Sequence, residues 1–218
     1  MSVRVPVLAP AVPRRGSRVM PALGRAVLAL IGWRVEGNLP DLPKFIIIGA
    51  PHSSNWDFIA GMAVAFALDL KVTVLAKKQL FVGPLGAVMR FCGVVPVDRS
   101  APHGLVGECV ALLKGSERMV VGITPEGTRN PGPRWKMGFY HIALQSGVPI
   151  VPIGLDFGNR LLRIGAPLAA SGDMDADMAV LGHFYIGMKG KRRTIQPAPF
   201  EPGAGDRPRG TPEDRLRA

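Results

Sequence analysis

The 218-residue chain has few of the residues on which several classes of protein depend. Its two cysteines, Cys92 and Cys109, form no C-x-x-C or Cys/His ligand pattern, and the chain has only four histidines, so no metal site is evident. We expect both thiols to be buried in a reducing compartment, with a disulfide between them as the alternative. Aromatic residues make up only 6% of the chain, which argues against nucleic-acid binding by base stacking. No run reaches the ~18 apolar residues expected of a membrane-spanning helix.

Apolar residues and basic residues, in contrast, are abundant. Hydrophobic residues make up 47% and charged residues 20%, which is typical of a globular chain with one substantial core. Lysine and arginine exceed aspartate and glutamate by 27 to 16, giving a net charge of +11. This excess predicts an anionic partner, namely nucleic acid, anionic lipid or a phosphorylated substrate.

The N-terminal region combines basic residues, prolines and a short amphipathic pattern. We expect residues 1–20 to form a flexible basic leader and residues 21–34 to form a helix. Leu23, Val27, Leu30 and Ile31 recur at helical spacing in that segment. Such a helix lies on a membrane surface or packs on the core of its own domain, and the two are compatible. The segment does not resemble a signal peptide, so we expect a cytoplasmic protein.

From residue 35 to residue 196, apolar strands alternate with helices. This alternation predicts an α/β fold with a mixed, largely parallel sheet flanked by helices, preceded by the N-terminal amphipathic helix. We expect residues 197–218, rich in Pro, Gly, Asp and Arg, to be a disordered tail. The expected strands are Phe45–Gly49, Val72–Ala76, Val94–Val97, Met119–Ile123, Ile150–Leu155 and Leu161–Ile164, and the expected helices are Trp56–Leu68, Leu85–Cys92, Leu105–Leu113, Phe139–Gln145 and Met174–Met188.

A histidine and an aspartate follow the first of these strands in the segment "HSSNWD". Residues five apart on one helix point about 140° away from each other, so His52 and Asp57 meet only if His52 lies in a loop and Asp57 in the first helical turn. Ser54 suits the N-cap position, which makes Asp57 the N3 residue. The pattern therefore fits both a catalytic base with its orienting acid and an ordinary capping box.

Two later strand ends each deliver an arginine. "TPEGTRN" follows Met119–Ile123 and contains Glu126 and Arg129, and "GVVPVDRS" ends a strand with Asp98 and Arg99. Because the carboxyl ends of parallel strands share one edge of a sheet, both arginines could grip an anionic substrate there. The alternative for each is a solvated surface turn.

Four segments in this order resemble the motifs of the PlsC-like glycerophosphate and lysophosphatidate acyltransferases. They are "HSSNWD", "GVVPVDR", "TPEGTR" and "VPIVPIG", and they span His52 to Gly154. H-x4-D alone is a weak signal, but H-x4-D followed by PEGTR after a strand is strong. Thr124 replaces the phenylalanine usual in the third motif. Asn55 and Trp56 indicate a subtype, which leaves the acceptor open.

The resemblance implies an O-acyltransferase in which His52 is the general base and Asp57 orients its imidazole. The acyl donor is then acyl-CoA or acyl-carrier protein, and the acceptor is the hydroxyl of a lysophospholipid-like molecule such as 1-acylglycerol-3-phosphate. No bound cofactor, metal or nucleic acid is implied. The implied acceptor- and phosphate-binding residues are Arg99, Glu126, Gly127, Thr128, Arg129 and Lys136, with Gly138 beside Lys136 and with Lys77 as a weaker candidate.

The basic excess suits both a phosphorylated acceptor and an anionic membrane surface, so we expect a peripheral protein on the cytoplasmic face of a membrane. Three alternatives remain at this point. The acceptor is a different lyso-lipid or lipid-linked hydroxyl, the reaction is thioester hydrolysis, or the chain is a non-enzymatic module that binds anions through clusters such as "KGKRR", Lys189 to Arg193.

Overall fold

The computed structural model describes residues 5–77, 79, 81–97, 104–127 and 135–192. Within these residues, seven strands form one sheet in the order β1-β7-β6-β2-β5-β3-β4. Only β6 and β7 pair in antiparallel fashion, so the sheet is mixed and largely parallel, as predicted. The strands are β1 Arg34–Glu36, β2 Lys44–Ala50, β3 Val72–Lys77, β4 Val94–Val97, β5 Met119–Ile123, β6 Ile150–Asp156 and β7 Leu161–Ile164.

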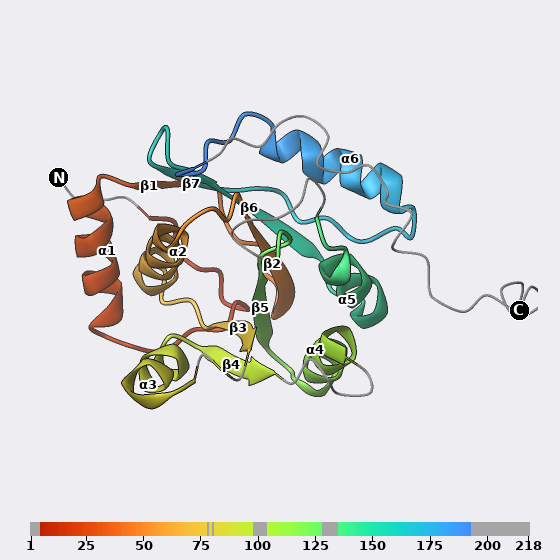
Figure 1. Cartoon of the computed structure of the whole chain (residues 1–218), viewed down its shortest axis with the longest axis horizontal. Helices are drawn as coiled ribbons and strands as arrows, with labels where there is room; N and C mark the ends of the chain where they lie inside the picture. The colour runs from red at the N-terminus through yellow and green to blue at the C-terminus, as the bar shows by residue number, and fades with distance from the viewer. Residues whose placement is uncertain (1–4, 78, 80, 98–103, 128–134, 193–218) are drawn as a thin grey trace, which may run out of the picture.

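Helices cover both faces of this sheet (Figure 1). Side chains of α1, α2 and α3 contribute to the apolar cluster on one face, and those of α4, α5 and α6 contribute to the cluster on the other. The helices are α1 Met20–Ile31, α2 Asn55–Ala67, α3 Gly83–Phe91, α4 Gly104–Gly115, α5 Gly138–Ser146 and α6 Met174–Tyr185. Each expected helix is present, and the ends differ from the predicted ones by three residues at most.

The central strands read as continuous apolar runs because both of their faces are buried. In β2, Phe45 and Ile47 point into the cluster beneath α1 and α2, whereas Ile46 and Ile48 point into the cluster beneath α5 and α6. β2 pairs with β5 and β6, and the last residue of β2, Ala50, precedes a cis peptide bond to Pro51. His52 follows Pro51 and lies just beyond the carboxyl end of this central strand.

The prediction of a flexible leader is wrong for residues 5–19, which pack on the domain. Val12 is fully buried, and the backbone N–H of Lys71 donates to the carbonyl of Pro13. The guanidinium of Arg118, just before β5, donates to the carbonyls of Pro10, Ala11 and Val12. These contacts join parts of the chain that lie from about 60 to more than 100 residues apart, so they leave no local signal in the sequence.

Helix α1 packs closely on α2 through its only glycine. A Cβ atom on Gly24 would lie 2.3 Å from the backbone nitrogen of Ala67, so the two helix backbones approach each other directly. Leu28 is buried on the same face, but Leu30, which we placed on the apolar stripe, is 86% exposed. Among the described residues, no helix is both long enough and apolar enough to cross a bilayer.

Candidate active site

The turn between β2 and α2 brings His52 and Asp57 together. The Nδ1 atom of His52 lies 3.3 Å from Oδ2 of Asp57, whose side chain is only 1% exposed, whereas the histidine side chain is 17% exposed. Because the carboxylate can only accept, Nδ1 carries the proton and Nε2 is the basic nitrogen of the ring. The predicted geometry, with His52 in the loop and Asp57 in the first helical turn, is confirmed.

Backbone groups hold the Asp57 carboxylate in place. Its Oδ2 accepts hydrogen bonds from the N–H groups of Ser53 at 2.5 Å and Ser54 at 2.6 Å. The hydroxyl of Ser54 donates to Oδ1 at 3.2 Å and accepts from the N–H of Trp56. The capping box expected from Ser54 and Asp57 is therefore present, and it also fixes the oxygen that faces His52.

Glu126 ties the end of β5 to the histidine loop. It is almost fully buried, and its Oε2 accepts the backbone N–H of His52 at 2.9 Å. This contact positions the histidine, a role that the sequence did not predict. The predicted role of Glu126 in acceptor binding stays a prediction.

Gly127 and Lys136 lie against each other at the edge of the site. Gly127 has a φ of 68°, and a Cβ atom there would lie 2.9 Å from Cδ of Lys136, so the lysine side chain crosses the glycine. The N–H of Lys136 donates to the carbonyl of Pro125, which holds the lysine backbone beside the turn. The other predicted anion-binding residues, Arg99, Thr128 and Arg129, lie outside the described residues, as does the side chain of Lys77.

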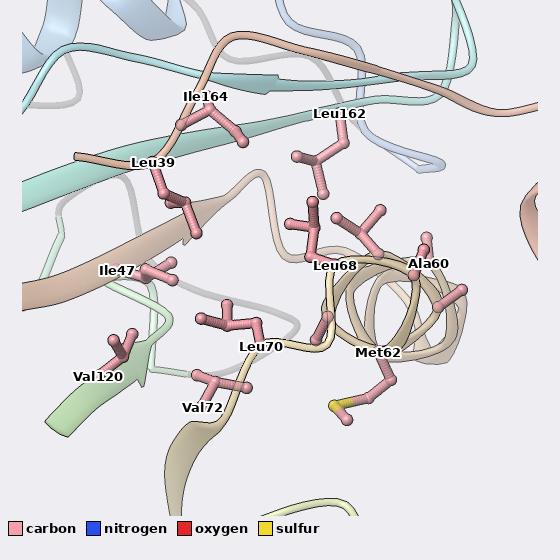
Figure 2. Packing of buried hydrophobic residues seen from close by; sticks show 14 of the residues in the cluster. Leu39, Ile47, Ala60, Met62, Leu68, Leu70, Val72, Val120, Leu162 and Ile164 are labelled. Carbon is pink, nitrogen blue, oxygen red and sulfur yellow. The ribbon is translucent and has the colours of Figure 1, made fainter. Parts of the chain in front are cut away.

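An apolar cavity of about 490 Å³ extends from this site into the protein. His52, Asp57, Gly127 and Lys136 line its polar part, and Gly138 also lines it. The apolar wall beneath α2 includes residues that Figure 2 shows pointing toward a common space: Leu39, Ile47, Leu68, Leu162 and Ile164.

The wall on the other face of the sheet includes Cys109. Burial raises the pKa of the Cys109 thiol to about 12, and the nearby Glu108 carboxylate acts in the same direction. The thiol is therefore neutral near pH 7 and serves as apolar lining. Both Cys92 and Cys109 are free and buried, as expected.

Tyr185, at the end of α6, bonds to two strands that lead toward the site, and it was not identified from the sequence. Its fully buried hydroxyl donates to the carbonyl of Ile48 at 2.7 Å and accepts the N–H of Ile153 at 3.1 Å. Its ring packs edge-on against Trp135, 5.1 Å between centroids. Burial raises the pKa of Tyr185 well above 10, and the Glu126 carboxylate acts in the same direction, so the hydroxyl keeps its proton.

The described residues contain no group of three His, Cys, Asp or Glu side chains placed to hold a metal ion. The arrangement contains instead an oriented imidazole, a buried carboxylate behind it and an apolar cavity in front of it. Such an arrangement can remove a proton from a hydroxyl while an apolar substrate occupies the cavity.

The chain is similar in sequence to known proteins of one family. The chain is similar to the 1-acyl-sn-glycerol-3-phosphate acyltransferase of Escherichia coli, with 31% identity over 57% of this chain and 53% of that protein. It is also similar to the human 1-acyl-sn-glycerol-3-phosphate acyltransferase beta, with 34% identity over 60% of this chain and 54% of that protein. The chain thus spans about half the length of the curated relatives it matches.

The fold is similar to that of a solved structure, the 1-acyl-sn-glycerophosphate (LPA) acyltransferase PlsC from Thermotoga maritima. The TM-score is 0.52 at 21% identity, covering 74% of this chain and 72% of that one. The family model described as Acyltransferase matches residues 33–156, more than half of the chain and the whole stretch from β2 to β6. The chain belongs to this acyltransferase family.

Proposed function

We propose that the protein transfers a fatty acyl group from an acyl thioester to the hydroxyl of a lysophospholipid-like acceptor, with 1-acylglycerol-3-phosphate as the first candidate. The observation that carries this proposal is the oriented His52–Asp57 pair at the mouth of an apolar cavity. The names of the Escherichia coli and human relatives support the choice of acceptor.

In this reaction, Nε2 of His52 takes the proton of the acceptor hydroxyl as its oxygen attacks the thioester carbonyl. The resulting tetrahedral intermediate collapses, the C–S bond breaks, and the thiolate takes the proton back from the imidazolium. The products are an acyl ester and a free thiol. Asp57 holds the ring and stabilises the transient positive charge, which is the role of the acid in hydrolase triads. A general base of this kind contributes about 10²- to 10⁴-fold in rate.

The two parts of the cavity suit the two parts of the substrates. The apolar wall would bury the acyl chain, whose transfer out of water is favourable in proportion to its area. Lys136 beside Gly127 would meet a phosphate near the histidine, together with Arg99 and Arg129, for which the proposal rests on the sequence resemblance. Whether the thiol belongs to CoA or to acyl-carrier protein is decided by the assay below.

We also propose that the protein works as a peripheral protein on the cytoplasmic face of an anionic membrane, since its acceptor is a lipid. Large apolar side chains are exposed along α1, including Leu23 and Leu30. Exposed basic residues lie on α1, at Arg25, and on α3, at Arg90. On α3 and its N-cap, the exposed apolar residues recur every three positions, at Val82, Leu85, Val88 and Phe91. The change Leu85→Glu should weaken sedimentation with anionic vesicles, and unchanged binding would contradict this placement.

The decisive experiment is a product assay in anionic liposomes with labelled long-chain acyl-CoA and lysophosphatidate. His52→Ala is the test variant, because it removes the base but keeps the backbone N–H that donates to Glu126. His183→Ala, an exposed histidine on α6, is the matched control. We expect labelled phosphatidate from the wild type and the control, and a loss of about 10²- to 10⁴-fold with His52→Ala.

Other outcomes identify the alternatives. Label that remains in the thioester would rule out this donor and acceptor pair, and acyl-carrier-protein donors and a lipid extract would then replace them. Labelled free fatty acid without acylated lipid would indicate a thioesterase. Full transfer by His52→Ala would refute the proposed mechanism.

A further inference from the structure

The end of the described chain returns to the catalytic turn. After α6, the side chain of Met188 packs onto β6 at Gly154. A Cβ atom on Gly154 would collide with the sulfur of Met188. The carbonyl of Lys189 then accepts the N–H of Phe157 at 2.7 Å. These two contacts fix the start of the basic segment 189–192 beside the carboxyl end of β6, which is a neighbour of β2 in the sheet.

The next residues of this segment contact the H-x4-D motif itself. The backbone N–H of Arg192 donates to the hydroxyl of buried Ser53 at 3.3 Å, and Ser53 is the residue directly after the catalytic histidine. The Nζ atom of Lys191 lies 4.2 Å from the centre of the Trp56 ring, which is 47% exposed and directly precedes Asp57. The basic segment and the catalytic turn thus form one surface.

The structure shows no ion pair between this segment and another described residue. Lys191 and Arg192 are both exposed, and neither lies within ion-pair distance of a carboxylate among the described residues. The stacking of Lys191 on Trp56 restricts where the ammonium group lies. Trp56 holds the Lys191 ammonium, and Ser53 holds the backbone of Arg192. Two cations so placed, without a carboxylate partner among the described residues, are suited to bind an anion.

We propose that Lys191 and Arg192 form a phosphate-binding subsite beside the turn that carries His52 and Asp57, with Trp56 positioning the lysine. The inference rests on the proposed function, because the phosphate belongs to one of the two substrates. It is a nucleotide phosphate of an acyl-CoA donor or the phosphate of the acceptor. Ser53 and Trp56, which the segment contacts, lie in the same turn as His52 and Asp57, so a phosphate bound to these cations would lie beside the proposed catalytic pair.

The first test measures binding without catalysis. The double variant Lys191→Gln/Arg192→Gln is compared with Lys114→Gln/Arg163→Gln, which removes the same charge from exposed positions on α4 and β7. Calorimetric titrations use coenzyme A and a short-chain lysophosphatidate, each beside its phosphate-free counterpart, pantetheine or a monoacylglycerol. We expect the dissociation constant of a phosphate ligand to rise about 10- to 100-fold in the first variant only.

The pattern of losses identifies the source of the phosphate. A loss for coenzyme A with pantetheine unaffected assigns the subsite to the donor, and a loss for lysophosphatidate with monoacylglycerol unaffected assigns it to the acceptor. In acyl-transfer kinetics, the loss should appear in the KM of that substrate more than in kcat. Bound ligand should also reduce quenching of Trp56 by iodide in the wild type.

Several results would overturn the subsite. These are equal affinities in the two double variants, equal losses for ligands with and without phosphate, or a loss confined to anionic vesicles, which would indicate membrane attraction instead. The outcome is separable from the proposed function. If the wild-type protein transfers no acyl group but binds phosphate through these residues, the proposed function is refuted and the subsite stands. If the Lys191→Gln/Arg192→Gln variant keeps full acyl-transfer activity, the subsite is refuted and the function stands.

Discussion

The change Tyr185→Phe removes one buried oxygen that bonds to β2, the strand that leads into the His52 loop. In the register of β2 and β6, Ile48 lies opposite Pro152, and a regular parallel ladder would join the N–H of Ile153 to the carbonyl of Ile48. The tyrosine hydroxyl bonds to both of these groups while the two strands stay paired at this point. Phenylalanine keeps the ring contact with Trp135 but leaves the two backbone groups without the hydroxyl.

The expected loss of stability depends on how well the strand pairing alone satisfies these two backbone groups. If the groups depend on the hydroxyl, a buried donor and a buried acceptor each lose a partner, at about 1–3 kcal/mol per group. If the ladder bond satisfies both groups after Ile48 shifts, the loss is only about 1 kcal/mol. Ile48 lies four residues before His52, and a misplacement of about 1 Å can lower a rate about 10²-fold. We therefore expect a lower free energy of unfolding, a lower kcat, or both.

Urea denaturation measures the free energy of unfolding, and the liposome assay measures kcat. Tyr140→Phe is the matched control, because the chain has only two tyrosines and the Tyr140 hydroxyl bonds Asp177 and Gly172, not the strand ends. The control should lose stability but keep kcat. Wild-type stability and kcat in Tyr185→Phe, or an equal loss of kcat in Tyr140→Phe, would refute the positioning role.

Three further changes test other parts of the structure. Asp57→Asn should lower kcat about 10²- to 10⁴-fold in the liposome assay while the protein still unfolds cooperatively, because the amide supplies no negative charge to stabilise the imidazolium. Gly24→Ala should lower the free energy of unfolding by about 1–3 kcal/mol in urea, since the collision with the Ala67 backbone outweighs a helix-propensity gain of about 1 kcal/mol. Burial acts to raise the pKa of Asp177, but hydrogen bonds from Ser171 and the Tyr140 hydroxyl outweigh it and lower the pKa below 3.8. The ionised carboxylate therefore contributes stability above pH 3.8 that is lost as the pH falls through the lowered pKa, so Asp177→Asn should be less stable than the wild type at pH 7, with a difference that shrinks in acid melts.

The order of elements was predictable because the strands and helices carry strong local patterns. The apolar runs of β2 and β6 mark strands buried on both faces, and the glycines and prolines between elements mark turns. The strand β1, Arg34–Glu36, was missed because three residues with one apolar side chain show no periodicity. It exists through its parallel pairing with β7, more than a hundred residues away.

The site was predictable only where its residues lie close together in sequence. His52 and Asp57 share one turn, so their spacing predicts their contact. Two contacts depend on the register of the sheet, which the sequence alone does not define. They are the bond from the His52 backbone to Glu126 and the bonds of the Tyr185 hydroxyl to β2 and β6. The basic residues around Lys191 were noticed as a cluster, but their contact with Trp56 required the structure.

The segment "HSSNWD" forms both a helix cap and an oriented histidine–aspartate pair, so the cap does not argue against the proposed catalytic role. One oxygen, Oδ2 of Asp57, accepts the N–H groups of Ser53 and Ser54 and also faces Nδ1 of His52. The backbone donors fix the carboxylate before any substrate arrives, so the imidazole is oriented by a group that folding has already placed. The cap also binds the ionised form of the acid, which is the form that can stabilise an imidazolium. The capping box of Ser54 and Asp57 begins two residues after His52, which itself lies close to the end of a strand. Six consecutive residues can therefore hold a histidine and a carboxylate in contact.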